Sequence, residues 1–263
     1  MMSRRKKSTA SEKIIPIENK YKLYLKNFEL TKKQHQFLKI AFDKNTKIVF
    51  VSGPAGSSKT FISIYAALQL FNMNMHQDLF YVRTIAESAD RNLGSLPGDV
   101  NEKFNPFMMP MQDKLSELLE PDQIKMLLDE KIIQSAPINF LRGASWSNKL
   151  IIADESQNFT KKELVTLITR IGNNSKYFIC GDPMQPDING KTGFVSIMDL
   201  FDDEDSKAKG VYTFKFTKED IVRSEILKFI VNNCLFTVFQ IRIYISFVNF
   251  YCYCPSRFCT IDI

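Results

Sequence analysis

The chain has 263 residues, of which 44% are hydrophobic and 24% charged, and its formal net charge is +6. This length allows one large domain or two small ones, and the composition is typical of a soluble protein with a buried core. The five cysteines have no regular spacing, which argues against a disulfide framework and favours a reducing compartment. We therefore expect a cytoplasmic protein.

The positive charge is concentrated at the N-terminus. Residues 1–33 hold ten Lys or Arg against three Asp or Glu, and the rest of the chain is nearly neutral. No apolar run follows Arg4-Arg5-Lys6-Lys7, so this is not a secretory signal. We expect residues 1–30 to form a flexible basic arm. Such an arm is either a solvated tail or a source of non-specific attraction to nucleic-acid phosphates.

Two predicted elements lead to the stretch around which the chain is organised. Residues 30–42 predict a helix, with Thr31 as N-cap and apolar residues on one face. Residues 47–52 form an apolar, β-branched run bounded by a Gly/Pro turn, which predicts a buried strand.

The residues after this strand nearly match G-x-x-x-x-G-K-[ST], a loop whose backbone N–H groups surround nucleotide phosphates. The helical pattern that follows directs its positive N-terminal end at the same anion. We expect Lys59 to reach the β- and γ-phosphates and Thr60 to hold Mg²⁺, so ATP and Mg²⁺ are the expected ligands. Ser58 replaces the second glycine, which is tolerable if its backbone dihedrals stay negative. The predicted phosphate-binding residues are Gly53, Pro54, Ala55, Gly56, Ser57, Ser58, Lys59 and Thr60.

Further apolar runs predict strands at residues 78–84, 149–153, 177–180 and 211–216. Strands that alternate with helical patterns are typical of a parallel sheet with crossover helices. Residues 85–148 are less regular, contain helical patterns up to about Leu128, and indicate an insertion over one edge of the sheet. Residues 218–228 predict a short amphipathic helix with Arg223 on its polar side.

Two of these strands end in residues suited to catalysis. Asp154 and Glu155 follow an apolar run, where adjacent carboxylates need partners such as a metal ion. Beside a phosphate loop, Asp154 would support Mg²⁺ and Glu155 would orient and deprotonate the attacking water. Gln185 would hydrogen-bond the γ-phosphate and that water, although the pattern alone does not separate this role from a plain Gly-Asp-Pro turn.

The composition changes abruptly from about Val231. The last 33 residues contain no Lys, Glu or Gly, but eight aromatic residues and four of the five cysteines. Polar residues make this segment a poor membrane span, and its cysteines lack a convincing fourth zinc ligand. We expect no membrane association, and a domain at 31–230 followed by an atypical tail at 231–263.

Seven ordered motifs resemble the PhoH-like (phosphate-starvation-inducible) ATPase family, whose members are relatives of superfamily 1 helicases. They are the phosphate loop, Leu93-Gly94 with Leu96-Pro97-Gly98-Asp99, Leu141-Arg142-Gly143, Asp154-Glu155-Ser156-Gln157-Asn158, Thr169-Arg170-Ile171-Gly172, Gly181-Asp182-Pro183-Met184-Gln185 and Asp220-Ile221-Val222-Arg223. Ser95 departs from the family signature, which has Phe at this position. Ser58 resembles a variant of viral members, which points to a bacteriophage protein in the host cytoplasm.

The resemblance implies an α/β fold with a RecA-like three-layer P-loop NTPase core and a mostly parallel sheet. It places an extra strand between the phosphate-loop strand and the Asp154 strand. It also implies ATP hydrolysis, and it likens residues 30–34 to the helicase Q motif, in which Gln34 would read adenine.

The resemblance also suggests RNA or single-stranded DNA as a partner. A single RecA-like core would act on a strand only as a homo-oligomer, such as a ring, in which neighbours complete each other's sites. Four arginines are candidates for completing the site: Arg83, Arg142, Arg170 and Arg223. Arg223 is favoured because its position resembles that of such an arginine in helicases, and the alternative for it is a surface salt bridge.

Three functions stay open from the sequence. The first is a nucleic-acid-linked ATPase. The second is a nucleotide-dependent binding module in which Ser58 prevents turnover. The third is a small-molecule kinase, which is disfavoured because the adjacent acids Asp154 and Glu155 suit activation of water better than that of an acceptor alcohol.

Overall fold

The computed structural model describes residues 21–84, 100–138, 146–185, 193–222, 226, 228, 229 and 231, with the backbone alone for residues 100–107. Residues 1–20 of the predicted arm, the motifs at 93–99 and 141–143, Arg223 and residues 232–263 lie outside this part of the chain.

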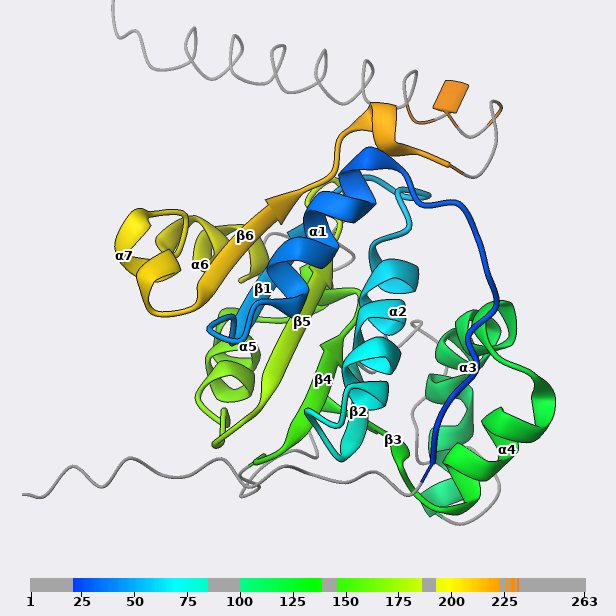
Figure 1. Ribbon diagram of the computed structural model, residues 1–263. Coiled ribbons are helices and arrows are strands. Elements are labelled where there is room, and N and C mark those ends of the chain that lie inside the picture. Colours follow the sequence, from blue (N-terminus) through cyan, green and yellow to red (C-terminus); the bar gives the residue numbers. More distant parts are fainter. Residues whose placement is uncertain are drawn as a thin grey trace, which may run out of the picture.

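Six parallel strands form one sheet in the order β3-β2-β4-β5-β1-β6 (Figure 1). The strands are β1 (Ile48–Ser52), β2 (Asp78–Arg83), β3 (Ile133–Pro137), β4 (Lys149–Ala153), β5 (Lys176–Gly181) and β6 (Val211–Lys215). Because β5 pairs with both β1 and β4, the predicted strand between the phosphate-loop strand and the Asp154 strand is confirmed.

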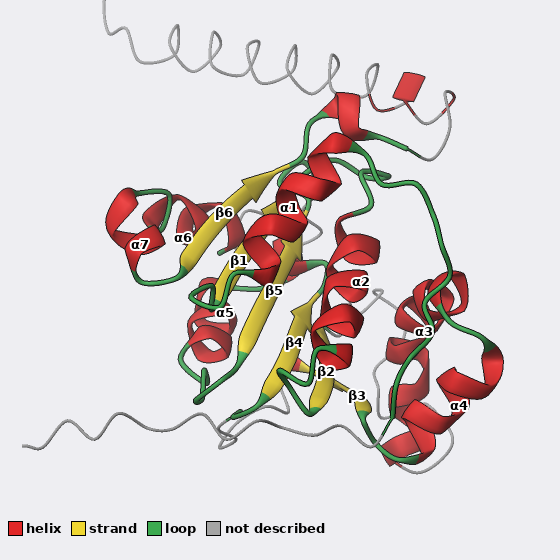
Figure 2. Ribbon diagram, viewed as in Figure 1, coloured by secondary structure: helices red, strands yellow, loops and turns green. Residues whose placement is uncertain are grey.

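Helices cover both faces of the sheet, as the alternation of side chains along the strands requires (Figure 2). In β1, Val49 and Val51 join the core that contains α1 (Lys32–Phe42), α2 (Lys59–Asn72), α3 (Val100–Leu118) and α4 (Pro121–Asp129). Ile48 and Phe50 join the opposite core, with α5 (Lys161–Ile168) and α6 (Phe194–Leu200). The chain is therefore a three-layer α/β protein, as predicted.

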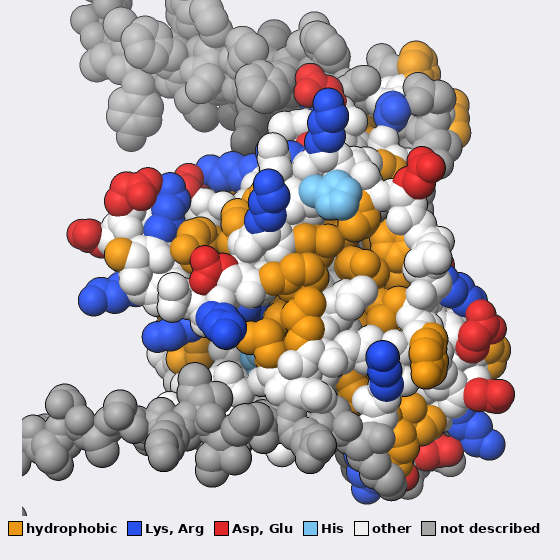
Figure 3. Space-filling model, in the orientation of Figure 1, with side chains coloured by type: hydrophobic (Ala, Val, Ile, Leu, Met, Phe, Trp, Pro, Cys, Tyr) orange, Lys and Arg blue, Asp and Glu red, His pale blue; other side chains and the backbone are white. Residues whose placement is uncertain are grey.

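The remaining elements are short. They are α7 (Glu204–Ala208) and the 3-10 turns η3 (Ser156–Asn158) and η4 (Lys218–Asp220). Over α1 and α2 the surface keeps an open hydrophobic area between charged side chains (Figure 3). Within the described residues, no helix is both long enough and apolar enough to cross a membrane.

Residues 21–30 differ from the predicted flexible arm. Leu23 is buried, and its backbone N–H and C=O both hydrogen-bond the side-chain amide of Asn72 at 2.8 Å. The N–H of Lys26 donates to the carbonyl of Leu118 at 2.8 Å. Residues 21–30 are therefore part of the folded domain, because Leu23 belongs to its hydrophobic core and the segment hydrogen-bonds residues of α2 and α3.

Two other elements differ from the prediction. Strand β3 was not predicted, because its middle residues Gln134 and Ser135 are polar and only half buried at the edge of the sheet. The helix predicted at 218–228 begins instead as the 3-10 turn η4, and the chain becomes extended at Ile221.

Candidate active site

A cavity of about 650 Å³ opens at the carboxyl ends of the strands. This is where ligands bind in open parallel sheets. The predicted site residues that line it are Gln34, Ala55, Gly56, Ser58, Lys59, Thr60, Asp154, Glu155 and Gln185. Gly53, Pro54 and Ser57 belong to the same loop and shape its backbone rather than lining the cavity.

The phosphate loop is held between neighbouring strands and requires a glycine at its start. The N–H of Gly53 donates to the carbonyl of Gly181 at 3.3 Å. A Cβ at this position would lie 2.7 Å from the Cβ of Phe216, so no larger residue fits without a shift. The hydroxyl and N–H of Ser57 both donate to the carbonyl of Pro54 and close the turn.

The expectation that Ser58 keeps negative dihedrals is wrong. Its φ is 60° and its ψ is 24°, a left-handed conformation immediately before α2 begins at Lys59. Glycine adopts this conformation freely, whereas a residue with a Cβ is strained by about 1–3 kcal/mol. The left-handed conformation that favours glycine at this position of the motif is therefore kept in this chain, although the residue is a serine.

Lys59 extends along the loop, and its ammonium donates to the carbonyl of Pro54 at 2.8 Å. Burial lowers the pKa of Lys59, while the nearby carboxylates of Asp182, Glu155 and Asp154 act in the opposite direction. An anion in the cavity would therefore gain a partly desolvated cation as its partner.

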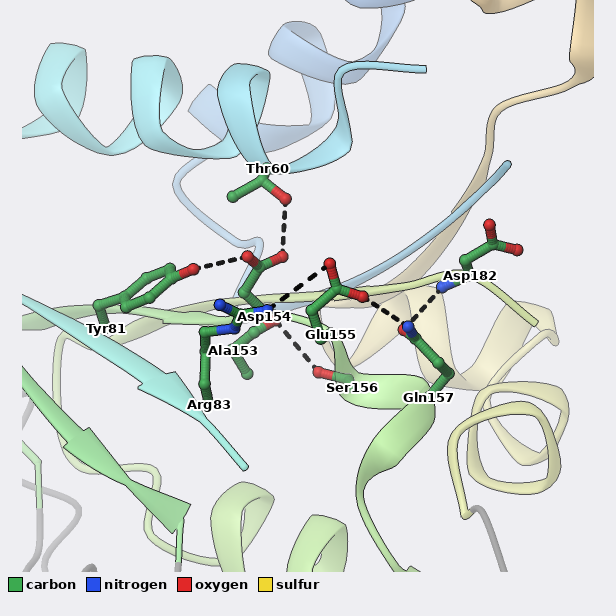
Figure 4. A network of polar contacts seen from close by, with 9 residues as sticks. All are labelled: Thr60, Tyr81, Arg83, Ala153, Asp154, Glu155, Ser156, Gln157 and Asp182. Atoms are coloured by element: carbon green, nitrogen blue, oxygen red, sulfur yellow. Dashed lines mark hydrogen bonds and ion pairs between the residues drawn. The ribbon is translucent and has the colours of Figure 1, made fainter. Parts of the chain in front are cut away.

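Thr60 and Asp154 meet across the cavity floor. The Thr60 hydroxyl donates to Oδ1 of Asp154 at 2.6 Å, and the Tyr81 hydroxyl donates to Oδ2 at 2.6 Å (Figure 4). Asp154 is only 5% exposed, so these two bonds satisfy a buried carboxylate. Burial, assisted by the charge of Asp154, raises the pKa of Tyr81 and keeps it a neutral donor.

This donor set fits Mg²⁺. Magnesium prefers oxygen ligands and is usually held by one or two carboxylates together with substrate phosphates and water. Thr60 and Asp154 supply a hydroxyl and a carboxylate oxygen side by side next to the phosphate loop. In the described part of the chain no group of three or more His, Cys, Asp or Glu side chains forms a metal cage.

Glu155 lies beside Asp154 at the open side of the site. Its φ of 51° is left-handed, which turns its side chain away from the strand direction. One carboxylate oxygen is 3.8 Å from the Arg83 guanidinium, and the other accepts a hydrogen bond of 2.5 Å from the amide of Gln157. The carbonyl oxygen of that amide accepts the backbone N–H of Asp182 at 2.9 Å.

Gln34 and Gln185 both line the cavity. Gln34 is 5% exposed, and its side-chain oxygen accepts the N–H of Thr31 in a capping box at the start of α1. The backbone N–H of Gln185 donates to the carbonyl of Asp182 at 3.2 Å. Their roles in reading adenine and sensing the γ-phosphate stay predictions.

The structure separates the candidate arginines. Arg83 lines the cavity and pairs with Glu155, whereas Arg170, at the end of α5, is not among the residues that line it. Arg142 and Arg223 lie outside the described residues. The residue before Arg223 is placed: Val222 lines the cavity and donates its N–H to the carbonyl of Gly56 at 3.2 Å.

Sequence reasoning missed two residues of the site. Tyr81 lies in the predicted strand 78–84, and its side chain is fully buried. A tyrosine hydroxyl in a buried strand position requires a partner, which was the available signal. Gln157 belongs to a quoted motif, but no periodicity indicates that its amide bridges Glu155 and Asp182.

The parallel sheet, the phosphate loop and the Thr60–Asp154 pair define a P-loop NTPase with a RecA-like core. Within this class, the family model described as "PhoH-like protein" matches residues 28–234. The chain belongs to the PhoH-like family.

Relatives from distant bacteria support this assignment. The PhoH-like protein of Synechocystis sp. is 34% identical over 203 residues, which cover 76% of this chain and 60% of the relative. The PhoH-like protein of Mycobacterium tuberculosis (strain ATCC 25618 / H37Rv) is 32% identical over 194 residues, or 73% and 53% of the two chains. Protein PhoH of Escherichia coli (strain K12) is 31% identical over 188 residues, or 69% and 51%. The chain thus spans between half and three-fifths of these relatives.

Among solved structures, EssC (ATPases 2 and 3) from Geobacillus thermodenitrificans overlaps 60% of this chain and 29% of its own. The TM-score is 0.29 at 9% identity, which carries no argument about function.

Proposed function

We propose that this chain binds ATP together with Mg²⁺ and hydrolyses it to ADP and phosphate. The observation that carries the proposal is the hydrogen bond between Thr60 and Asp154 at the foot of the phosphate loop, with Glu155 next to it at the open side of the cavity. A nucleotide whose phosphates occupy the loop would place its terminal phosphate between Lys59 and these acids.

Each residue has a distinct task in this proposal. Lys59 and the backbone N–H groups of the loop bind the phosphates and offset their charge. Thr60 and Asp154 would hold Mg²⁺, and a bound Mg²⁺ would neutralise negative charge on the phosphate oxygens. Glu155 orients a water molecule and accepts its proton, a role that its exposed position beside the cavity permits.

We further propose that hydrolysis is coupled to RNA or single-stranded DNA in a homo-oligomer. The excess of Lys and Arg in residues 1–33 supports attraction to phosphate backbones. The support for Arg223 is that its position in the sequence resembles that of the arginine with which helicases complete a nucleotide site. In a single core the mouth of that site faces outward, so a neighbouring subunit would close it.

A second candidate is a nucleotide-dependent binding module with little turnover. The observation that favours it is the left-handed Ser58, because strain in the loop would leave the phosphates bound but displaced from the position needed for transfer. A small-molecule kinase is disfavoured, since the adjacent acids Asp154 and Glu155 suit activation of water better than that of an acceptor alcohol.

The test is Glu155→Gln, with Glu204→Gln on the exposed helix α7 as the matched control. We expect Glu155→Gln to bind ATP with native affinity in calorimetry but to release phosphate about a hundred- to ten-thousand-fold more slowly, the usual loss when a general base is removed. Glu204→Gln should behave like the native chain. Assays with and without single-stranded RNA and DNA measure the coupling.

The outcomes separate the candidates. Native hydrolysis by Glu155→Gln contradicts the assignment of the base. Tight binding without measurable phosphate release by the native chain, with or without single strands, establishes the binding module instead.

A further inference from the structure

Gln157 forms a bridge between the two halves of the catalytic edge. It follows β4 by four residues, lies in the 3-10 turn η3 and is only 3% exposed. Its amide nitrogen donates to Glu155, and its amide oxygen accepts the N–H of Asp182, which begins the turn after β5 (Figure 4).

The chemistry of the partners fixes the orientation of this amide. A carboxylate only accepts hydrogen bonds and a backbone N–H only donates them, so the nitrogen must face Glu155 and the oxygen must face Asp182. Both ends of a buried side chain are therefore used, and both contacts lie within the cavity wall.

The contacts leave Glu155 with unequal oxygens. Gln157 holds Oε2 at 2.5 Å, whereas Arg83 lies 3.8 Å from Oε1, beyond hydrogen-bond distance. Because Glu155 also sits on a left-handed backbone, its side chain is directed by Gln157 more than by its own strand. Oε1 is thus the oxygen left to meet a water molecule.

The other end of Gln157 reaches the turn that carries Gln185. Asp182 holds this turn through two bonds: its carboxylate accepts the N–H of Met184 at 3.0 Å and its carbonyl accepts the N–H of Gln185 at 3.2 Å. The single amide of Gln157 therefore links the residue proposed to activate water with the segment proposed to contact the γ-phosphate.

We propose that Gln157 is a positioning residue that aims the Glu155 carboxylate and ties it to the turn from Gly181 to Gln185. The proposal rests on the hydrolysis proposed above, with Glu155 as the base. It acts through Glu155 and does not touch the nucleotide, so its effect falls on turnover and leaves nucleotide affinity unchanged.

Two substitutions separate the two ends of the amide. Gln157→Glu has the same shape and keeps an acceptor for the Asp182 N–H, but it donates to Glu155 only while the pair of carboxyls keeps a proton, so the contact is lost at alkaline pH. Gln157→Met has similar volume and loses both contacts. Gln77→Glu is the matched control, since Gln77 is exposed at the opposite end of β2.

We expect Gln157→Met, and Gln157→Glu at alkaline pH, to lower kcat by about ten- to a hundredfold, the loss typical of a misplaced catalytic group, with the Kd for ATP unchanged. The Gln77→Glu control should keep the native kcat. The decisive measurement is single-turnover hydrolysis of labelled ATP by Glu155→Gln with and without Gln157→Met. If Gln157 acts through Glu155, the second substitution adds no further loss to a protein that already lacks the base.

The results distinguish this proposal from the one on which it rests. A native kcat in folded Gln157→Met, or a further loss when Gln157→Met joins Glu155→Gln, overturns the positioning role and leaves the ATPase assignment intact. Normal hydrolysis by Glu155→Gln alone overturns both. Thermal melting of each variant identifies loss of folding. If Gln157→Met does not fold, Gln157→Glu at alkaline pH decides the matter, since a native kcat there overturns the positioning role.

Discussion

Two side-chain-bearing residues of the site, Ser58 and Glu155, hold a left-handed backbone at the edge of the same cavity. Such residues cost about 1–3 kcal/mol each and persist where the surrounding structure fixes them. Here the carbonyl of Ser58 accepts the N–H of Ile62 at 2.9 Å, and the amide of Gln157 donates to Glu155. Both left-handed residues are thus ones proposed to place the phosphates or the attacking water.

For Ser58 this leads to a stability prediction. Ser58→Gly should relieve the left-handed strain and raise the melting temperature by a few degrees, because about 1 kcal/mol corresponds to about 2–4 °C in a domain of this size. Lys131→Gly is the control, since Lys131 has a φ of 56° but lies at the end of α4, outside the cavity lining.

Calorimetry of ATP binding then separates the two variants. Both should melt higher than the native chain, but only Ser58→Gly should change the affinity for ATP, since Ser58 lines the cavity and Lys131 does not. A lower melting temperature for Ser58→Gly would contradict the strain. A large gain of phosphate release over a native chain with almost none would favour the binding module.

At the scale of elements, α1 is held to the sheet by a buried lysine of β5. Lys176 is 3% exposed, and its ammonium donates to the carbonyls of Ala41 at 2.6 Å and Asp43 at 2.8 Å, which end the helix. Carbonyls at a helix C-terminus need such donors. Burial lowers the pKa of Lys176 to about 8, although the charge of Asp43 opposes the shift. His76, whose pKa burial and Lys176 lower to about 4, lies nearby.

The lowered pKa predicts how stability depends on pH. Between about pH 8 and 10.5 the unfolded chain keeps a proton on Lys176 that the folded chain releases, so the free energy of unfolding rises with pH in this window. The gain is about 3 kcal/mol at most. In urea unfolding, Lys176→Met should lack this rise, whereas Lys39→Met on the exposed side of α1 should retain it. An equal slope in all three proteins would show that Lys176 is not the titrating group.

The strands that consist of apolar runs could be predicted from the sequence. The strands at 48–52, 78–83, 149–153 and 176–181 were anticipated because strands inside a parallel sheet are largely apolar along their length. The edge strand at 211–215 was anticipated as well, from its run of Val211, Tyr212 and Phe214. Strand β3 was not anticipated, since it pairs only with β2 and its exposed edge admits Gln134 and Ser135. The position of β5 between β1 and β4 came from family resemblance, because pairing of strands distant in sequence has no local signal.

At the scale of the whole molecule, the site also has a part that the sequence predicted and a part that it did not. The phosphate loop is one continuous segment, and so is the pair Asp154 and Glu155, so each was predicted from its own motif. Tyr81 hydrogen-bonds Asp154, which is 73 positions away in the sequence. Gln157 hydrogen-bonds Asp182, which is 25 positions away. Such contacts follow from the folded sheet, which brings the carboxyl ends of β2, β4 and β5 together.

The proposed assembly turns on Arg223, whose neighbour Val222 is bonded to the phosphate loop. Phosphoryl transfer builds charge on the γ-phosphate, and an arginine that meets it raises turnover about a thousand-fold or more. If Arg223 serves the site of a neighbouring subunit, Arg223→Ala and Glu155→Gln should each be nearly inactive alone.

Mixing the two inactive proteins tests the arrangement. In a head-to-tail assembly of equal parts, about a quarter of the interfaces should join an intact Glu155 to an intact Arg223, so activity should partly return. Subunit exchange is followed separately with labelled chains, and a mixture of Arg223→Ala with Lys59→Ala should recover in the same way, since each supplies what the other lacks. A mixture of the native chain with Glu155→Gln gives the activity expected when only part of the subunits in an assembly is active. If exchange is complete and neither mixture regains activity, Arg223 either serves the site of its own subunit or lies outside the reaction, and the shared site is ruled out.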